Sequence, residues 1–289
     1  MSATSLTWDG RSIPGPGGLP AVAVSLTGPS LAQARTQARS AIDAGADVLE
    51  LRVDLLEEAG ALAAPAPLDA ATAAAQVLEC LRGLREAIDT TDGADAGSPV
   101  LLTCRTAAEG GRARLDDASY GALLRSVLDG LADWAPERRP AAIDVEVQRG
   151  CLPQVCAQAH ALSIDIVASF HDFEATPADE ALEEVLARMA REGADLAKIA
   201  VWPTSADDVA RLLGVCARAT AGAGEGTGLG VPVAAMSMGA LGAVSRVAPA
   251  FGSALTFAVV PDEQGQARAS APGQLPIQDV RRCLELLRA

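Results

Sequence analysis

The chain has 289 residues, of which 49% are apolar and 21% are charged, a composition typical of a globular protein rather than a disordered one. The formal net charge of −14 argues against nucleic-acid binding, because a phosphate backbone requires a basic face. An acidic chain that binds an anion must concentrate positive charge locally, so individual arginines become candidate ligands.

The sequence also indicates where such a protein works. The segment MSATSLTWDG has neither the basic region nor the apolar core of a targeting signal. The longest apolar stretch, residues 229–245, contains Pro232 and many small residues, which favours a buried strand and the start of a helix over a membrane span. Six scattered cysteines without a CxxC pair are typical of reduced thiols. We therefore expect a cytoplasmic protein without membrane contact.

With only two histidines, we expect no metal site.

Taken in chain order, the elements begin with residues 1–19, where the turn signal Asp9-Gly10 between Leu6 and Ile13 predicts a small hairpin. Short apolar runs typical of buried strands follow at 21–26, 48–53, 100–104, 142–147, 164–170, 196–202, 231–236 and 254–260. Segments of helical length and pattern include 31–44, 120–132, 152–162, 178–191, 206–219 and 276–287. Gly-, Ala- and Pro-rich composition predicts loops or loose helix starts at 60–75 and 90–98, and a loop at 222–230.

Eight strands, each followed by a helix, predict an α/β fold with a parallel sheet, and eight is the number that closes as a (β/α)8 TIM barrel. A doubly wound open sheet is the alternative, but it usually carries a Gly-rich fingerprint after its first strand, and none is present here. We expect a single domain over residues 1–289, with the 1–19 hairpin as an extension that closes the bottom of the barrel.

The basic residues are almost all arginine: the chain has 22 arginines and a single lysine, Lys198. A lysine amine can lose its proton and attack carbon, whereas a guanidinium stays charged. A lysine retained by chance would lie on the surface, but residues 194–202 form an apolar run typical of a buried parallel strand. This pattern favours a chemical role for Lys198.

Polar residues cluster where the predicted strands end, which is where barrel enzymes build their sites. Alternation along the second strand places Glu50, Arg52 and Asp54 on one face. Other strand ends carry Arg105 and Glu109, Asp144 and Glu146, His171, and Met236. Charges at the same end of several strands are hard to explain as packing, because each buried charge needs a partner.

Most of these residues fall in a series of motifs along the chain. The motifs are VSLTG (24–28), ELRVD (50–54), Arg105-x-x-x-Glu109-Gly110-Gly111, SFHDF (169–173), AKIAVWP (197–203), MSMG (236–239), Ser245-Arg246, FGSALTFA (251–258) and SAPGQ (270–274). This series resembles the type I 3-dehydroquinate dehydratases. They occur in the order of the family and span most of the chain. The departures from the family lie in the longer connections at 60–75, 90–98 and 222–230.

The resemblance implies a Schiff-base mechanism in the shikimate pathway. Lys198 would attack the C3 ketone of 3-dehydroquinate and form an imine, which acidifies the neighbouring C2 proton. His171 would take that proton and then protonate the departing C1 hydroxyl. Glu109 would orient His171. No cofactor and no metal would be needed, since the lysine supplies the electron sink.

The resemblance also implies the substrate contacts. Arg246 would hold the substrate carboxylate, and Met236 would pack on the ring. The residues expected to meet the ring hydroxyls or to support Lys198 electrostatically are Ser25, Glu50, Arg52 and Arg105. Ser270 and Gln274 would belong to a loop that closes over the substrate. The family is often dimeric, so a homodimer is expected.

Several residues near the motifs receive supporting or structural roles. Asp144 and Glu146 are expected to support Arg105 or His171, and Asp172 and Phe173 to fix the turn after His171.

Two other interpretations of the function stay open: another Schiff-base barrel, such as a class I aldolase, and a non-catalytic barrel that acts as a binding protein. The sequence does not distinguish biosynthesis from quinate breakdown.

Overall fold

The computed structural model describes residues 5–64, 68–90, 97–221, 228–261 and 268–288, and its central feature is one eight-stranded parallel sheet. The strands are β3 (Ala21–Leu26), β4 (Val48–Arg52), β5 (Val100–Thr103), β6 (Ala142–Glu146), β7 (Asp165–Asp172), β8 (Leu196–Val201), β9 (Val233–Ser237) and β10 (Leu255–Ala258). They pair in the order β10-β3-β4-β5-β6-β7-β8-β9, so neighbours along the chain are neighbours in space.

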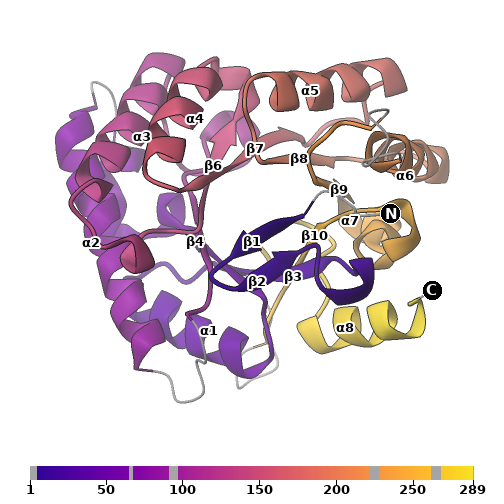
Figure 1. Ribbon diagram of the computed structural model, residues 1–289, viewed down its shortest axis with the longest axis horizontal. Helices are drawn as coiled ribbons and strands as arrows, with labels where there is room; N and C mark the ends of the chain where they lie inside the picture. The colour runs from indigo at the N-terminus through magenta and orange to yellow at the C-terminus, as the bar shows by residue number, and fades with distance from the viewer. Residues whose placement is uncertain (1–4, 65–67, 91–96, 222–227, 262–267, 289) are drawn as a thin grey trace.

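The two ends of this sheet meet and close the barrel. The backbone N–H of Ala254 donates to the carbonyl of Val233 at 2.7 Å, and the N–H of Ala235 donates to the Ser253 hydroxyl at 3.3 Å. Figure 1 shows the strands as a ring with helices around it. The predicted (β/α)8 barrel is confirmed.

Helices fill the connections between the strands. They are α1 (Leu31–Asp43), α2 (Ala70–Asp89), α3 (Asp117–Leu131), α4 (Leu152–Ala161), α5 (Asp179–Arg191), α6 (Ala206–Thr220), α7 (Gly239–Gly242) and α8 (Ile277–Leu286). Several begin at a side-chain cap that satisfies a free backbone N–H: Ser30 accepts from Gln33, and Ser205 forms a capping box with Asp208. None of the described helices is long and apolar enough to span a membrane.

The helix predicted after every strand is very short for β9, which is followed by the four-residue α7 and by two 3-10 segments, Ala243–Val247 and Pro249–Phe251. The Ser245 hydroxyl donates to the Gly242 carbonyl at 2.7 Å and accepts the Ser237 N–H at 2.9 Å. These bonds tie the segment against the end of β9, so it cannot extend outward as a helix. They also bring the neighbouring Arg246 into the barrel mouth.

The three predicted loop segments are described only in part. Within 60–75, a 3-10 segment (Glu57–Ala63) is followed by α2, whose cap Asp69 accepts from the N–H groups of Ala71 and Thr72. The segment is therefore partly helical, as a loose helix start. Most of 90–98 and of 222–230 lies outside the described residues.

The N-terminal hairpin, β1 (Leu6–Trp8) and β2 (Arg11–Ile13), closes the bottom of the barrel as predicted. Trp8 and Ile13 are buried in a cluster with residues near the starts of the barrel strands, among them Ala21, Val48, Leu101, Ala142 and Leu196. The Trp8 indole N–H donates to Asp165 Oδ2 at 2.8 Å. Figure 1 shows the hairpin lying across the middle of the ring. The opposite end of the barrel therefore remains for the site.

Candidate active site

A pocket opens among the carboxyl ends of the strands, with ≈ 470 Å³ of empty space that includes its open mouth. Every site residue predicted from the sequence except Ser25 lines it. The lining residues are Glu50, Arg52, Arg105, Glu109, Gly110, His171, Phe173, Lys198, Ala200, Met236, Arg246, Phe257, Ser270, Ala271 and Gln274. Residues separated by more than 200 positions in the chain thus share one pocket, which lies where barrel enzymes carry their chemistry.

Lys198 points into this pocket from the middle of β8, where it pairs in register with Ser169 of β7. It is buried, and its Nζ lies 3.3 Å from Oδ2 of Asp144. The same nitrogen lies 4.7 Å from the centre of the Phe257 ring, a cation–π distance. A carboxylate and an aromatic ring therefore hold the amine at a fixed place in the pocket.

His171, near the end of β7, is held by Glu109. His171 Nδ1 lies 2.8 Å from Glu109 Oε2, and the same oxygen accepts the backbone N–H of His171 at 3.1 Å. Glu109 reaches this position from a 3-10 turn that ends at Gly110 with φ of 80°, a conformation that favours glycine. A Cβ at Gly111 would lie 2.1 Å from the Arg105 carbonyl, so the Gly-Gly step permits a tight turn.

Burial changes the pKa of both His171 and Glu109. It lowers the pKa of His171 well below its usual 6.5, and the cations Arg105, Lys198 and Arg52 lower it further. Burial also raises the pKa of Glu109 to about 8; Arg105 opposes this shift, while the carboxylates Glu146 and Asp144 add to it. The imidazole is therefore neutral at neutral pH, as a general base must be.

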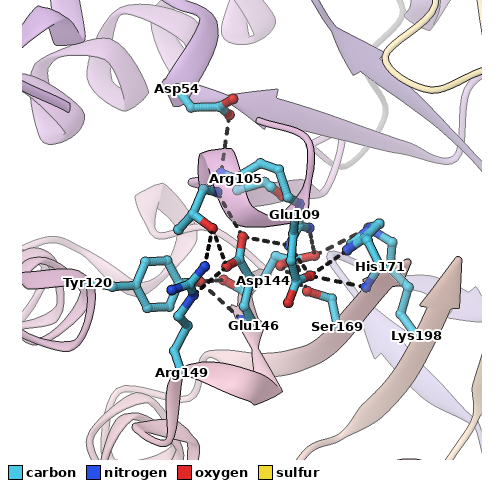
Figure 2. A network of polar contacts seen from close by, with 12 residues as sticks. Asp54, Arg105, Glu109, Tyr120, Asp144, Glu146, Arg149, Ser169, His171 and Lys198 are labelled. Atoms are coloured by element: carbon cyan, nitrogen blue, oxygen red, sulfur yellow. Dashed lines mark hydrogen bonds and ion pairs between the residues drawn. The ribbon is translucent and has the colours of Figure 1, made fainter. Parts of the chain in front are cut away.

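Arg105 organises the buried carboxylates behind the pocket (Figure 2). Its guanidinium lies 2.8 Å from Asp144, 3.1 Å from Glu146 and 3.6 Å from Glu109. Burial opposes its charge, but these three carboxylates raise the pKa of Arg105 well above its usual range. Asp144 and Glu146 thus support Arg105, as expected. Arg105 lies at the pocket wall with its donors directed mainly at protein groups.

The residues of β4 have mixed environments. Arg52 makes a two-point ion pair with Asp54, with both nitrogen–oxygen distances at 2.8 Å. Glu50 accepts from the hydroxyls of Ser25 and Thr103. Glu50 and Arg52 line the pocket directly, whereas Ser25 reaches it only through its bonds to Glu50 and Ser270.

Arg246 differs from the other arginines of the pocket. It is buried, yet among the described residues no carboxylate lies within ion-pair distance of it. Its contacts are weak ones to two carbonyls, Phe257 at 3.4 Å and Pro272 at 3.2 Å, and its Nε has no partner there. Burial lowers its pKa to about 10. An unpaired buried guanidinium is a receptor for an anion.

The loop 268–274 lies against this site. Ser270 donates to the Ser25 hydroxyl at 2.8 Å, and Gln274 exchanges bonds with Ser270 at 2.9 and 3.0 Å. A Cβ at Gly273 would lie 2.2 Å from the Gly239 carbonyl, so the loop meets the segment after β9 without space for a side chain there. The loop is thus placed to cover the pocket.

This arrangement matches known proteins along nearly its whole length. A family model described as type I 3-dehydroquinase matches residues 22–289. The chain belongs to the type I 3-dehydroquinase family. Membership makes it a dehydratase, a hydro-lyase, which is the enzyme class that the motifs predict.

Individual relatives agree with this family in sequence and in fold. The 3-dehydroquinate dehydratase of Klebsiella pneumoniae is 36% identical over 270 residues, which cover 92% of each chain. The structure of 3-dehydroquinate dehydratase from Geobacillus kaustophilus HTA426 has a TM-score of 0.78 at 30% identity and covers 98% of this chain and 96% of that one. The type I enzyme from Clostridium difficile, solved with covalently modified comenic acid, has a TM-score of 0.79 at 28% identity and covers 99% of both chains.

Sequence reasoning missed three features of this family member. Asp172 fixes the turn after His171 as expected, by accepting the N–H groups of Glu174 and Ala175. The first missed feature is the Phe173 ring, which lines the pocket and stacks near His171, with ring centres 6.4 Å apart. The contacts of Phe257 and Asp144 with Lys198 were also missed, although Phe257 stands in a recognised motif.

Proposed function

We propose that this enzyme removes water from 3-dehydroquinate, a step of the shikimate pathway, through an imine on Lys198. The observation that carries the proposal is the content of one pocket. It holds the sole lysine of the chain, a neutral histidine held by a glutamate, and a buried arginine that has no carboxylate partner among the described residues. The Clostridium difficile relative with covalently modified comenic acid supports covalent chemistry in this family.

The amine of Lys198 attacks the C3 carbonyl carbon of the substrate. The carbinolamine then loses the former ketone oxygen as water and leaves a protonated imine. The positive nitrogen withdraws electrons from the adjacent C2–H bond, so C2 can release a proton at neutral pH. A guanidinium could not perform this step, because it does not give up its proton.

His171 transfers the proton. Because Nδ1 faces Glu109, Nε2 is the nitrogen left for the substrate. It takes the C2 proton, and the electron pair enters the imine to form an enamine. The pair then returns and expels the C1 hydroxyl, which leaves as water with the proton supplied by the imidazolium. Hydrolysis of the product imine releases 3-dehydroshikimate and regenerates Lys198.

The remaining pocket residues bind the substrate. Arg246 forms a two-point contact with the carboxylate, and Glu50 and Arg52 meet ring hydroxyls. Met236 packs on the ring, and Ser25 supports Glu50 and the loop. Ser270 and Gln274 close the pocket and exclude water from the imine.

A direct assay tests this activity. Purified protein with 3-dehydroquinate should produce the ultraviolet absorbance of the conjugated enone product. The same protein should not cleave sugar phosphates, which are substrates of class I aldolases. A barrel that only binds ligands would give neither signal, so an absence of enone formation would overturn the proposal.

We also propose that the enzyme is a cytoplasmic homodimer folded as a single domain. The six cysteines are all free, which fits a reducing compartment. The apolar side chains Leu241, Val244 and Phe251 are exposed on the segment after β9, which fits association with a second copy. Sedimentation equilibrium tests the dimer, and one cooperative thermal transition is expected for a single domain.

A further inference from the structure

Asp144 lies between Arg105 and Lys198, two of the buried cations of the site (Figure 2). It comes from the middle of β6, and its side chain is fully buried. Oδ2 lies 2.8 Å from Arg105 Nη2 and 3.3 Å from Lys198 Nζ, while Oδ1 accepts the Ser169 hydroxyl at 2.6 Å. Within the described part of the chain, no other carboxylate lies within ion-pair distance of Lys198.

The neighbouring carboxylate Glu146 has a different set of partners, although it lies on the same strand and is equally buried. It bonds Arg105 at 3.1 Å, Arg149 at 3.0 Å and both the N–H and the hydroxyl of Thr106. Arg105 therefore keeps a carboxylate partner without Asp144, whereas Lys198 does not. Of the two carboxylates, Asp144 is therefore the one whose loss would leave Lys198 without an ion-pair partner among the described residues.

The other charged groups around Lys198 do not replace Asp144. Those that share the pocket are Glu50 and Arg52 from β4, Arg105 and Glu109 after β5, His171 of β7, and Arg246 after β9. Of the two carboxylates in this set, Glu50 bonds hydroxyls and Glu109 bonds His171. Burial alone would raise the pKa of Asp144, but Arg105, Lys198 and the Ser169 hydroxyl lower it, so this carboxylate remains ionised.

We propose that Asp144 is a positioning residue that fixes the Lys198 amine and carries the counter-charge of the imine formed on it. The proposal rests on the imine mechanism proposed above. The charge balance explains why one carboxylate can pair with both the Lys198 ammonium and the protonated imine. An ammonium and a ketone give a protonated imine and water: the nitrogen passes two protons to the departing oxygen and keeps one. The positive charge on nitrogen is thus the same before and after, and the Asp144 ion pair persists.

Asp144→Asn tests this role, with Glu146→Gln as the matched control. Both changes replace a buried carboxylate of β6 that bonds Arg105 with an amide, but only the first removes the partner of Lys198. Without substrate, acetic anhydride labelling across pH reports the free amine, and Lys198 is the only lysine to be mapped. Because Asp144→Asn removes the anion beside the Lys198 amine, it should move the labelling profile to lower pH. Glu146→Gln should keep the parental profile.

A second measurement follows the imine. Borohydride added with 3-dehydroshikimate at neutral pH should trap about tenfold less ligand on Asp144→Asn than on the parent, because the amine is no longer held in position to attack the carbonyl carbon. Asp144→Glu should restore part of the trapping. If Asp144→Asn does not fold, Ser169→Ala removes only the hydroxyl that orients Asp144 and should shift labelling in the same direction by a smaller amount.

The outcomes separate the two proposals. A parental labelling profile in the soluble Asp144 or Ser169 variant would overturn the role of Asp144, and so would an equal shift in Glu146→Gln. If the parent itself traps no ligand, the imine mechanism is wrong. The labelling profile needs no substrate and reports on Asp144 in either case.

Discussion

Oε2 of Glu109 accepts both from the Nδ1 side of the His171 ring, at 2.8 Å, and from the His171 backbone N–H, at 3.1 Å. One carboxylate oxygen therefore fixes the position of the strand end and the orientation of the imidazole together. The ring cannot turn without breaking the first bond, and the strand cannot shift without breaking the second. This geometry leaves Nε2 as the ring nitrogen that does not face Glu109.

The first prediction concerns that imidazole. His171→Ala should still form the imine, slowly, but should lose turnover by on the order of a hundredfold or more, because the C2 proton has no acceptor. Enone absorbance measures turnover, and mass spectrometry after borohydride measures the imine. Near-parental turnover would exclude His171 as the acid–base group.

The second prediction concerns the pH dependence of stability. Burial raises the pKa of Glu109 from 4.5 to about 8, so the folded form binds this proton more tightly than the unfolded form. The resulting stability is complete below pH 4.5 and is lost as pH rises through about 8. Glu109→Gln cannot titrate, so its Tm relative to the parent should increase between pH 5.5 and 9. A constant difference in Tm across this range would contradict the shifted pKa.

The third prediction concerns Arg246. Arg246→Ala should raise KM about ten- to a hundredfold, because the substrate carboxylate loses its charged partner. Arg246→Lys should restore only part of the binding, since a point charge cannot make a two-point contact. Arg191→Ala, at an exposed ion pair with Glu184, is the control and should leave KM unchanged. An unchanged KM in Arg246→Ala would assign the carboxylate to another residue.

The fourth prediction concerns the loop 268–274. Its bonds to Ser25 and Thr27 should strengthen when a ligand fills the pocket, so bound product should protect the exposed Arg268 from trypsin. Cleavage after the exposed Arg191, at the end of α5, should not change. Equal rates of cleavage after Arg268 with and without 3-dehydroshikimate would show that the loop is not a lid.

Local pattern was sufficient to predict most of the fold. Each barrel strand is a short apolar run, and polar residues follow at its end. The hydrophobic periodicity and the alternation of strands and helices along the chain therefore predict the barrel, without knowledge of which residues meet in space. The segment after β9 is the exception. Its apolar composition suits a helix, but the bonds of Ser245 to Gly242 and Ser237 hold it against the strand. Such tertiary bonds leave no periodic signal.

The sequence identified the residues of the site but not all of the contacts between them. Asp144 and Lys198 lie on β6 and β8, with β7 between them, and they meet because both face the interior of the closed barrel. Ser169 of β7 bridges them, since it pairs in register with Lys198 and donates to Asp144. Only the curvature of the barrel brings these groups together. The contact of Phe173 with His171 was missed for a similar reason, because it depends on the path of the turn.

The covalent mechanism is tested most directly by borohydride trapping, since Lys198 and the N-terminus are the only amines of the chain. Protein treated with borohydride and 3-dehydroshikimate should lose activity and gain the mass of one reduced ligand, located on the peptide that contains Lys198. Borohydride alone should have no effect, because no imine is present to reduce. Lys198→Arg should fold, trap nothing and show no turnover. Turnover by Lys198→Arg, or inactivation by borohydride without ligand, would contradict an imine on Lys198.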